Sequence, residues 1–296
     1  VLDPRNLATV YQRNGLGDLT QLSSPDTGVA SSSHDANGNL LTRSDSRGVT
    51  ATYTYDALNR RTALVYAKPG QVSQAYAWTY DQSGGDFGAG VGRLTTATHP
   101  AGSTQYGYDT QGRLTRSLQS IGDSTFNTRY GYDAAGQLTH ITYPSGRVLT
   151  IAYEAGRPVS LSLASGAGSA AQPLVSQIQW EPFGAVRGWT MHMNGAATQR
   201  YERVFDVYGR LVRYPLDSQV RDLRYDAADR IVKYEHLDAA TGTPTSASLA
   251  WDQSFGYDEL GRLTQVATSN SSWTIRYDAN GNRSSCQATS NTAPLT

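Results

Sequence analysis

A short phrase recurs along this chain: an aromatic residue, an acid, two or three variable residues, usually Gly, then often Arg or Asn and an aliphatic residue. The clearest copies are Tyr108–Thr115 and Tyr257–Thr264. A unit that returns every 20 to 32 residues is typical of an array in which each unit packs on its neighbours. The eleven acidic positions are Asp35, Asp56, Asp81, Asp109, Asp133, Glu154, Glu181, Asp206, Asp226, Asp258 and Asp278.

The residues on both sides of the phrase favour β-strands. Thr52–Tyr55 and Tyr130–Tyr132 precede an acid, and Leu138–Tyr143 follows a Gly. Asp suits the first position of a hairpin loop because its carboxylate accepts backbone N–H bonds, and Gly suits the last because it tolerates positive φ. The phrase therefore predicts a hairpin corner.

Within one corner, the flanking residues Tyr108 and Arg113 are expected to form the closing cross-strand pair, with the guanidinium stacked on the ring. Asp held by backbone N–H groups has a lowered pKa, which is the wrong direction for a general acid. The turns that define the repeat carry Tyr55, Asp56, Tyr108, Asp109, Gly112, Arg113, Tyr132, Asp133, Gly136, Asp206, Gly209, Arg210, Tyr225, Asp226, Tyr257, Asp258, Gly261, Arg262, Tyr277, Asp278 and Gly281.

The pattern predicts an all-β fold, an array of antiparallel hairpins over residues 1–283, followed by a polar and flexible tail at 284–296. Eleven hairpins at roughly 4.8 Å per strand make a ribbon on the order of 100 Å wide. Because strands twist, such a ribbon should curl into an arc or a spiral. If it closes, side chains cannot fill it, so it surrounds a cavity.

The composition favours an ordered chain with a neutral surface. Leu, Ile, Val and Phe make up fewer than a fifth of the residues, but 19 Tyr and 5 Trp supply apolar surface. The zero net charge argues against nucleic acid and anionic membranes as partners, and no apolar run is long enough to span a bilayer. Cys286 is alone, which excludes an intrachain disulfide. The first residue is Val rather than Met, as expected for a piece of a longer protein.

Corners of the form Tyr-Asp-x-x-Gly-Arg-Leu at irregular spacing resemble the YD repeats of the Rhs family, which is related to the shell proteins of Tc toxins and to teneurins. Tyr108–Thr115, Tyr132–Thr139, Tyr257–Thr264 and Tyr277–Arg283 carry the resemblance. It implies a β-ribbon that spirals into a hollow shell around a C-terminal toxin. Family shells are several times longer than this chain, and the stretch associated with self-cleavage before the toxin has no match here.

The resemblance implies a structural role, with a polypeptide toxin cargo and the remaining shell of the parent protein as partners. It also implies a protein that is secreted or delivered by a bacterial secretion system. Exposed ribbon edges add the expectation of a homodimer formed by strand pairing.

Catalytic, metal and cofactor sites are not expected. The five His residues are scattered without metal-ligand spacing. The loops Asp35–Asn39 and Asp278–Asn282 have Gly at the fourth position and no closing Glu, which differs from the EF-hand pattern. We interpret these Asp residues mainly as turn caps, with weak cation binding as the alternative.

The alternative function is adhesion or carbohydrate binding, because flat rings stack on sugars. Tyr76, Trp78 and Tyr80 on one strand are the first candidates, and Trp180, Trp189 and Trp273 are the second set. Strand aromatics more often pack on neighbouring strands. Corners are weakest between Glu154 and Val207, which we interpret as a seam or bend in the array.

Overall fold

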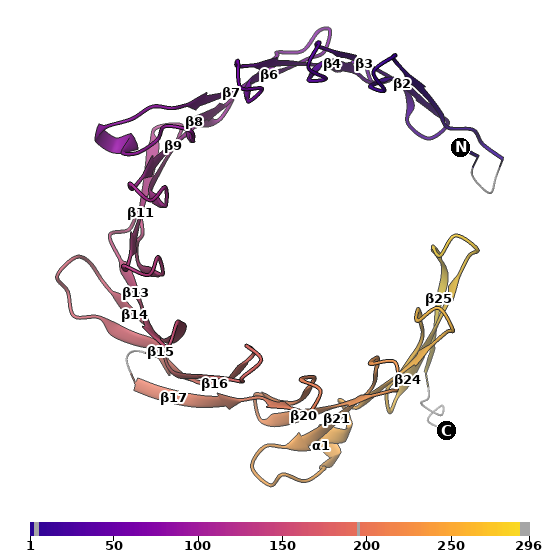
Figure 1. The fold of residues 1–296 in the computed structure, drawn as a ribbon. Coiled ribbons are helices and arrows are strands. Elements are labelled where there is room, and N and C mark those ends of the chain that lie inside the picture. The colour runs from indigo at the N-terminus through magenta and orange to yellow at the C-terminus, as the bar shows by residue number, and fades with distance from the viewer. Residues whose placement is uncertain (3–5, 194–195, 291–296) are drawn as a thin grey trace. The chain divides into compact units, whose positions relative to one another are not determined.

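The chain is almost entirely β-structure in the computed structural model, which describes residues 1–2, 6–193 and 196–290. It divides into two compact units, the first of residues Val1–Thr150 and Ala164–Ser169 and the second of Ile151–Leu163 and Ala170–Thr296. The boundary lies in β13, just before the stretch of weak corners that begins at Glu154. Each unit is a curved ribbon one layer of strands thick (Figure 1).

In the first unit, each strand pairs antiparallel with the next strand in the chain. Its elements are β1 (Val10–Arg13), β2 (Leu19–Ser24), β3 (Gly28–His34), β4 (Leu40–Ser44), β5 (Thr50–Tyr55), β6 (Arg61–Ala67), β7 (Gln74–Tyr80), the 3-10 helix η1 (Gly85–Phe87), β8 (Leu94–His99), β9 (Gly102–Tyr108), β10 (Leu114–Ile121), β11 (Ser124–Tyr132), β12 (Leu138–Thr142) and β13 (Val148–Glu154), whose last residues belong to the second unit.

The second unit repeats this plan, with sequential antiparallel pairing from β14 to β17 and from β18 to β25. Its elements are β14 (Arg157–Ala164), whose last residue belongs to the first unit, β15 (Gln172–Trp180), β16 (Val186–Met193), β17 (Ala196–Glu202), β18 (Val204–Phe205), β19 (Leu211–Leu216), β20 (Gln219–Tyr225), β21 (Ile231–Asp238), the short helix α1 (Ser246–Leu249), β22 (Gln253–Tyr257), β23 (Leu263–Ala267), β24 (Ser271–Tyr277) and β25 (Arg283–Ser290).

The described residues include very little core. The buried apolar side chains are Ala51, Leu64, Ala164 and Leu223. A single layer of strands cannot remove side chains from water on both faces, so most strand residues are half-buried at best. Local contacts between neighbouring hairpins therefore carry most of the stability, as in other repeat arrays. The predicted all-β array of antiparallel hairpins is confirmed.

The end of the chain differs from the expected flexible tail. Residues Arg283–Ser290 form β25, which pairs along its whole length with β24, for example Cys286 opposite Ile275. The polar Ser, Gln and Thr residues are compatible with this strand because it lies on an exposed surface. Residues 291–296 of the predicted tail lie outside the described residues.

Candidate functional site: the corner ladder

Each regular corner is a five-residue turn that the acid closes. At Asp109, the backbone N–H of Asp109 donates to the Arg113 carbonyl (3.0 Å), and that of Gly112 donates to the Asp109 carbonyl (2.9 Å). The Asp109 Oδ1 accepts the N–H groups of Gln111 (3.0 Å) and Arg113 (2.9 Å). Gly112 has φ of +80°, a conformation that costs a non-glycine residue free energy.

The predicted pairing of Tyr108 with Arg113 is wrong by one residue. Tyr108 lies opposite Leu114, and the register then shifts through a bulge before Arg116. The positive φ at Gly112 makes Arg113 the last residue of the turn rather than the first of the strand. Its side chain therefore turns back to the acid, with Arg113 Nε 2.6 Å from Asp109 Oδ2.

The guanidinium stacks on the aromatic ring of the next corner, not on that of its own corner. Arg113 lies 4.7 Å from the centroid of the Tyr132 ring, and Arg113 Nη1 donates to the carbonyl of Asp133 (3.1 Å). The Tyr132 hydroxyl in turn donates to the carbonyl of Leu114, beside the first corner (2.9 Å). One arginine and one tyrosine thus bind two consecutive corners together.

This arrangement recurs, and we call it the corner ladder. A rung consists of the Arg of one corner, the ring of the next corner, and the hydroxyl or indole N–H of that ring bound to a carbonyl at the start of the preceding strand. The rungs are Arg60–Tyr80, Arg93–Tyr108, Arg113–Tyr132, Arg157–Trp180, Arg210–Tyr225, Arg230–Tyr257 and Arg262–Tyr277. The corresponding donors are bound at 2.6 to 2.9 Å. Tyr55 makes the same hydroxyl bond to Leu40 (2.9 Å).

Two corners replace Gly with a side chain that adds to the ladder. Asn59 and Asp229 have φ of 60° at the glycine position. Asn59 Oδ1 accepts from Asn39 Nδ2 of the preceding corner (2.8 Å), and Asp229 pairs with Arg210 of the preceding corner (2.5 Å). Asn and Asp tolerate this backbone conformation better than other side chains. The side chain gained at these positions therefore provides a further bond between corners.

Several corner aspartates have a lowered pKa, which favours the ionised carboxylate. The backbone N–H of Arg262 is the largest influence on Asp258 and lowers its pKa; partial desolvation opposes this, and the Arg262 guanidinium adds to the lowering. Asp226 has a lowered pKa for the same reasons, through Arg230. For Asp109 desolvation is the largest influence and raises the pKa, but the bonds from Arg113 outweigh it, so the pKa is lowered. Such groups suit a structural clamp and not a general acid.

The sequence motif missed three corners of the same kind. Asn14, Asp45 and Tyr143 each close a five-residue turn with the Gly three residues on. Asp45 follows Ser44 and Asn14 is not an acid, so a search for an aromatic residue before an acid passes over them. The signal that finds Asn14 and Asp45 is Gly three residues after a turn-capping residue, as in Asp45–Gly48. Conversely, the corner at Asp81 is expanded by the insert that contains η1, and Glu154 begins a two-residue turn.

The first glycan candidates are engaged by their neighbours. Tyr80 belongs to a ladder rung, with Arg60 4.3 Å from its ring. Trp78 has the Arg61 guanidinium 5.7 Å from its ring, and Tyr76 contacts Tyr66 edge to face at 6.0 Å. Of the second set, Trp180 and Trp189 line one cavity, whereas Trp273 lies on β24 opposite Val266 and Ala288. The carbohydrate-binding alternative is not favoured.

His236 is the most deeply buried histidine, with a ring that is fully inaccessible. Nδ1 lies 3.1 Å from Asp252 Oδ1, and Nε2 accepts a hydrogen bond from Arg221 Nε (2.8 Å). Asp252 also accepts the backbone N–H of His236 (2.8 Å) and ends the insert that contains α1. Both ring nitrogens are used, so His236 anchors the insert to β21.

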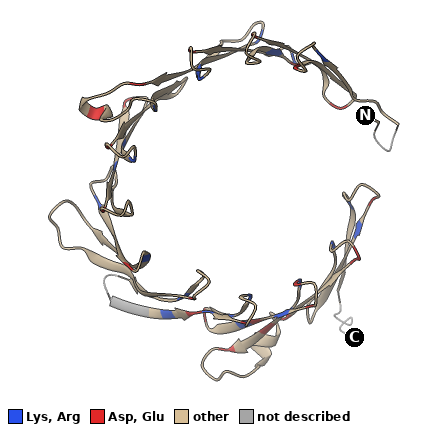
Figure 2. Ribbon diagram, viewed as in Figure 1, with Lys and Arg blue, Asp and Glu red and all other residues tan. Residues whose placement is uncertain are grey.

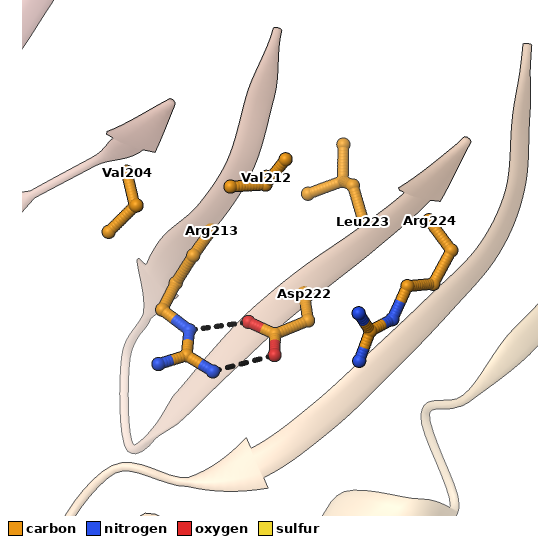
Figure 3. Close-up of a pocket in the computed structure, with 6 residues that line it drawn as sticks. All are labelled: Val204, Val212, Arg213, Asp222, Leu223 and Arg224. Atoms are coloured by element: carbon orange, nitrogen blue, oxygen red, sulfur yellow. Dashed lines mark hydrogen bonds and ion pairs between the residues drawn. The ribbon is translucent and has the colours of Figure 1, made fainter. Parts of the chain in front are cut away.

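A second polar cluster also has its partners within the sheet. A cavity of about 350 Å³ in the second unit is lined by Arg213 and Asp222, which form a two-bond ion pair across neighbouring strands (2.5 and 2.7 Å; Figure 3). Basic and acidic residues are both distributed along the ribbons of the two units (Figure 2). Over the described ranges, no three His, Cys, Asp or Glu side chains gather in a metal-ligand cluster. None of the helices described there could cross a bilayer.

The RHS repeat family matches residues 34–71, 90–125, 118–148 and 132–167. The fold is similar to that of chains in the crystal structure of TcdB2-TccC3, with a TM-score of 0.80 and 16% identity over 97% of this chain and 17% of that chain. The Tc holotoxin pore of Photorhabdus luminescens gives a TM-score of 0.77 with 16% identity over 97% of this chain and 16% of that chain. No curated protein sequence matches. This chain spans about a sixth of the length of the solved chains it matches.

The segments matched by the family contain the corners at Asp35, Asp56, Asp109 and Asp133, and the same turn and ladder geometry recurs as far as Asp278. The resemblance inferred from the Tyr-Asp phrase is therefore confirmed, and residues 34–71 and 90–167 of this chain match RHS repeats.

Proposed function

We propose that this chain is a segment of the wall of a hollow shell that encloses a polypeptide toxin or effector. The observation that carries the proposal is the corner ladder in a single layer of strands. A one-layer ribbon buries too little apolar surface to act as an ordinary globular domain, yet its corners are joined one to the next by charged, aromatic and hydrogen-bonded contacts. Such a ribbon suits a wall, which needs lateral continuity and two exposed faces.

The likeness to TcdB2-TccC3 and to a Tc holotoxin supports this assignment. Because this chain covers only about a sixth of those chains, the rest of the shell and the cargo would belong to the parent protein. The parent would be secreted or delivered by a bacterial secretion system. The segment itself would act by enclosure and not by catalysis.

Protease protection in the parent protein tests the proposal. The parent is expressed with the domain that follows its repeats, and that domain is also expressed alone as the matched control. We expect the downstream domain to resist a protease concentration that digests it when it is alone. Equal digestion of both forms, or a parent gene without a further domain after the repeats, would overturn cargo enclosure.

Pairing of two copies of the isolated chain through strand edges stays a prediction. Size-exclusion chromatography with light scattering tests it, and a monomer at all concentrations would remove it.

A further inference from the structure

An apolar hollow of about 410 Å³ lies on one face of the second unit, over β14 to β16. We call it the aromatic face, and its lining residues are Pro158, Val175, Ile178, Trp180, Val186, Trp189 and Arg203. Six of these side chains are apolar or aromatic. Among the lining residues, only Trp180 also belongs to a rung of the corner ladder.

A strand irregularity builds this face. Gln177 has φ of 51°, and the register between β15 and β16 shifts between Ser176 and Gln179. Arg200 holds the irregular segment, because its Nη1 donates to the Gln177 carbonyl (2.9 Å) and its Nη2 to Gln179 Oε1 (2.6 Å). The extra residues bring Val175, Ile178 and Trp180 to the same hollow, which simple alternation along a strand would not do.

The two indole rings are already fixed in place. Trp180 Nε1 donates to the Pro158 carbonyl (2.8 Å), and Trp189 stacks on Tyr201 with ring centroids 5.2 Å apart and planes at 11°. The Trp180 N–H group is therefore satisfied within the protein. A ligand that fills the hollow would meet apolar surface with little ordering cost.

One positive charge borders this hollow. The Arg203 guanidinium lies 4.9 Å from the Trp189 ring centroid, and among the described residues it has no carboxylate or carbonyl partner for its N–H groups. This contrasts with Arg60, Arg113, Arg210, Arg230 and Arg262, which all bind the acid of their own corner. A guanidinium beside apolar walls suits a ligand with an apolar group next to a carboxylate.

We propose that the aromatic face binds a peptide segment in which an aromatic side chain neighbours a carboxylate. The ring would fill the hollow against Trp189 and Ile178, and the carboxylate would pair with Arg203. A sugar fits less well, because its hydroxyl groups need several hydrogen-bonding partners and the lining offers one guanidinium. In the proposed shell such segments would come from an enclosed polypeptide, but the site is a property of this chain alone.

The test measures binding of two synthetic peptides to the isolated chain by NMR titration. The peptides are acetyl-Ser-Phe-Asp-Ser-amide and its Asn counterpart, which differ only in the carboxylate. We expect weak binding of both peptides through the ring and a preference of about two- to fivefold for the Asp peptide, the size of a partly exposed ion pair.

Variants locate the site. Arg203→Gln should abolish the preference and keep the weaker binding of the Asn peptide, whereas Arg203→Lys should keep a preference. Arg43→Gln is the matched control, since Arg43 is an exposed arginine on the first unit that lines other hollows, and it should change nothing. Thermal unfolding of each variant verifies that it is folded.

Three outcomes would overturn the inference. The first is that neither peptide binds at millimolar concentration. The second is that the Asp and Asn peptides bind equally. The third is that Arg203→Gln still prefers the Asp peptide. Because the experiment uses no cargo and no parent protein, its failure leaves the enclosure proposal untouched, and failure of protease protection leaves this site untouched.

Discussion

At the scale of single residues, the arginine that ends a ladder corner such as that of Asp109 has two tasks. It neutralises the acid of its own turn and covers the ring of the next corner, as Arg113 does with Asp109 and Tyr132. Lysine would keep the charge but lacks the planar group that binds and stacks at once. We therefore expect arginine to stabilise the corner more than lysine does, although both carry the same charge.

We predict that Arg113→Lys lowers the free energy of unfolding by about 1 to 2 kcal/mol, because it loses the bond to the Asp133 carbonyl and the stacking on Tyr132. Urea unfolding followed by circular dichroism measures the change. Arg47→Lys is the matched control: Arg47 also binds the acid of its own turn, Asp45, but its side chain is 77% exposed and covers no ring. It should cost clearly less than Arg113→Lys, and equal costs at both sites would show that the ladder contact adds nothing.

A second prediction separates turn strain from the ladder. Gly112→Ala must adopt a φ of +80°, and its Cβ would also overlap the Arg93 guanidinium, which covers Tyr108. Gly122→Ala meets the same backbone penalty at a φ of +55° but has open space around the added carbon. We expect both variants to lose about 1 to 2 kcal/mol for the conformation, with a larger loss for Gly112→Ala.

Chemical denaturation of the two glycine variants gives the difference directly. An equal loss would mean that Arg93 moves aside without cost. A larger loss in Gly122→Ala would contradict the assignment of Arg93 to a rung.

At the scale of elements, the sequence predicts what is local and misses what depends on twist and register. The Asp-x-x-Gly turn and its β-prone flanks are local, so the hairpins at Asp109 and Asp258 are predictable. The partner of Arg113 is not predictable, because Tyr132 comes within reach only through the bulge and the pairing of two intervening strands. The strand β25 is not predictable from the sequence for a related reason. Its polar residues lack a strand pattern, and pairing with β24 orders them.

The insert between β21 and β22 provides a prediction at this scale. Replacing His236 by Leu removes the group between Arg221 and Asp252 and leaves both charged side chains partly buried without it. We expect a loss of about 2 to 4 kcal/mol in stability. We also expect faster amide hydrogen exchange in the insert Ala239–Asp252 than elsewhere in the second unit.

Hydrogen exchange with mass spectrometry locates that effect, and His140→Leu, at an exposed site on β12, is the control for removing a histidine. A uniform increase in exchange across the second unit would contradict the anchoring role of His236.

At the scale of the whole molecule, an aspartate with a lowered pKa recurs in many of the corners, so the effects of pH on stability at these corners should add. The pKa values of Asp56, Asp109, Asp206, Asp226, Asp258 and Asp278 all lie below the ordinary 3.8. A lowered folded-state pKa contributes stability that is present above the unfolded value and is lost as pH falls through the folded value. We therefore expect stability to decline below about pH 4.

The tyrosines of the ladder limit the stability of the fold at alkaline pH. Desolvation raises the pKa of Tyr108, Tyr132, Tyr225 and Tyr257 above the ordinary 10.0. A raised folded-state pKa contributes stability that is complete below the unfolded value and is lost as pH rises through the folded value. The hydroxyl of Tyr132 also donates a hydrogen bond that ionisation would remove, so the alkaline decline should begin above about pH 10.

Urea midpoints between pH 2.5 and 11 should thus form a broad plateau with a decline on each side. Asp109→Asn keeps the Oδ1 acceptor for the turn but cannot ionise, so it should be less stable at neutral pH and show a shallower acid decline than the parent chain. An identical acid decline in both proteins would mean that general charge repulsion, and not the corner carboxylates, limits the ribbon in acid. A decline that begins well above pH 4 would contradict the assignment of the acid limit to the corner carboxylates.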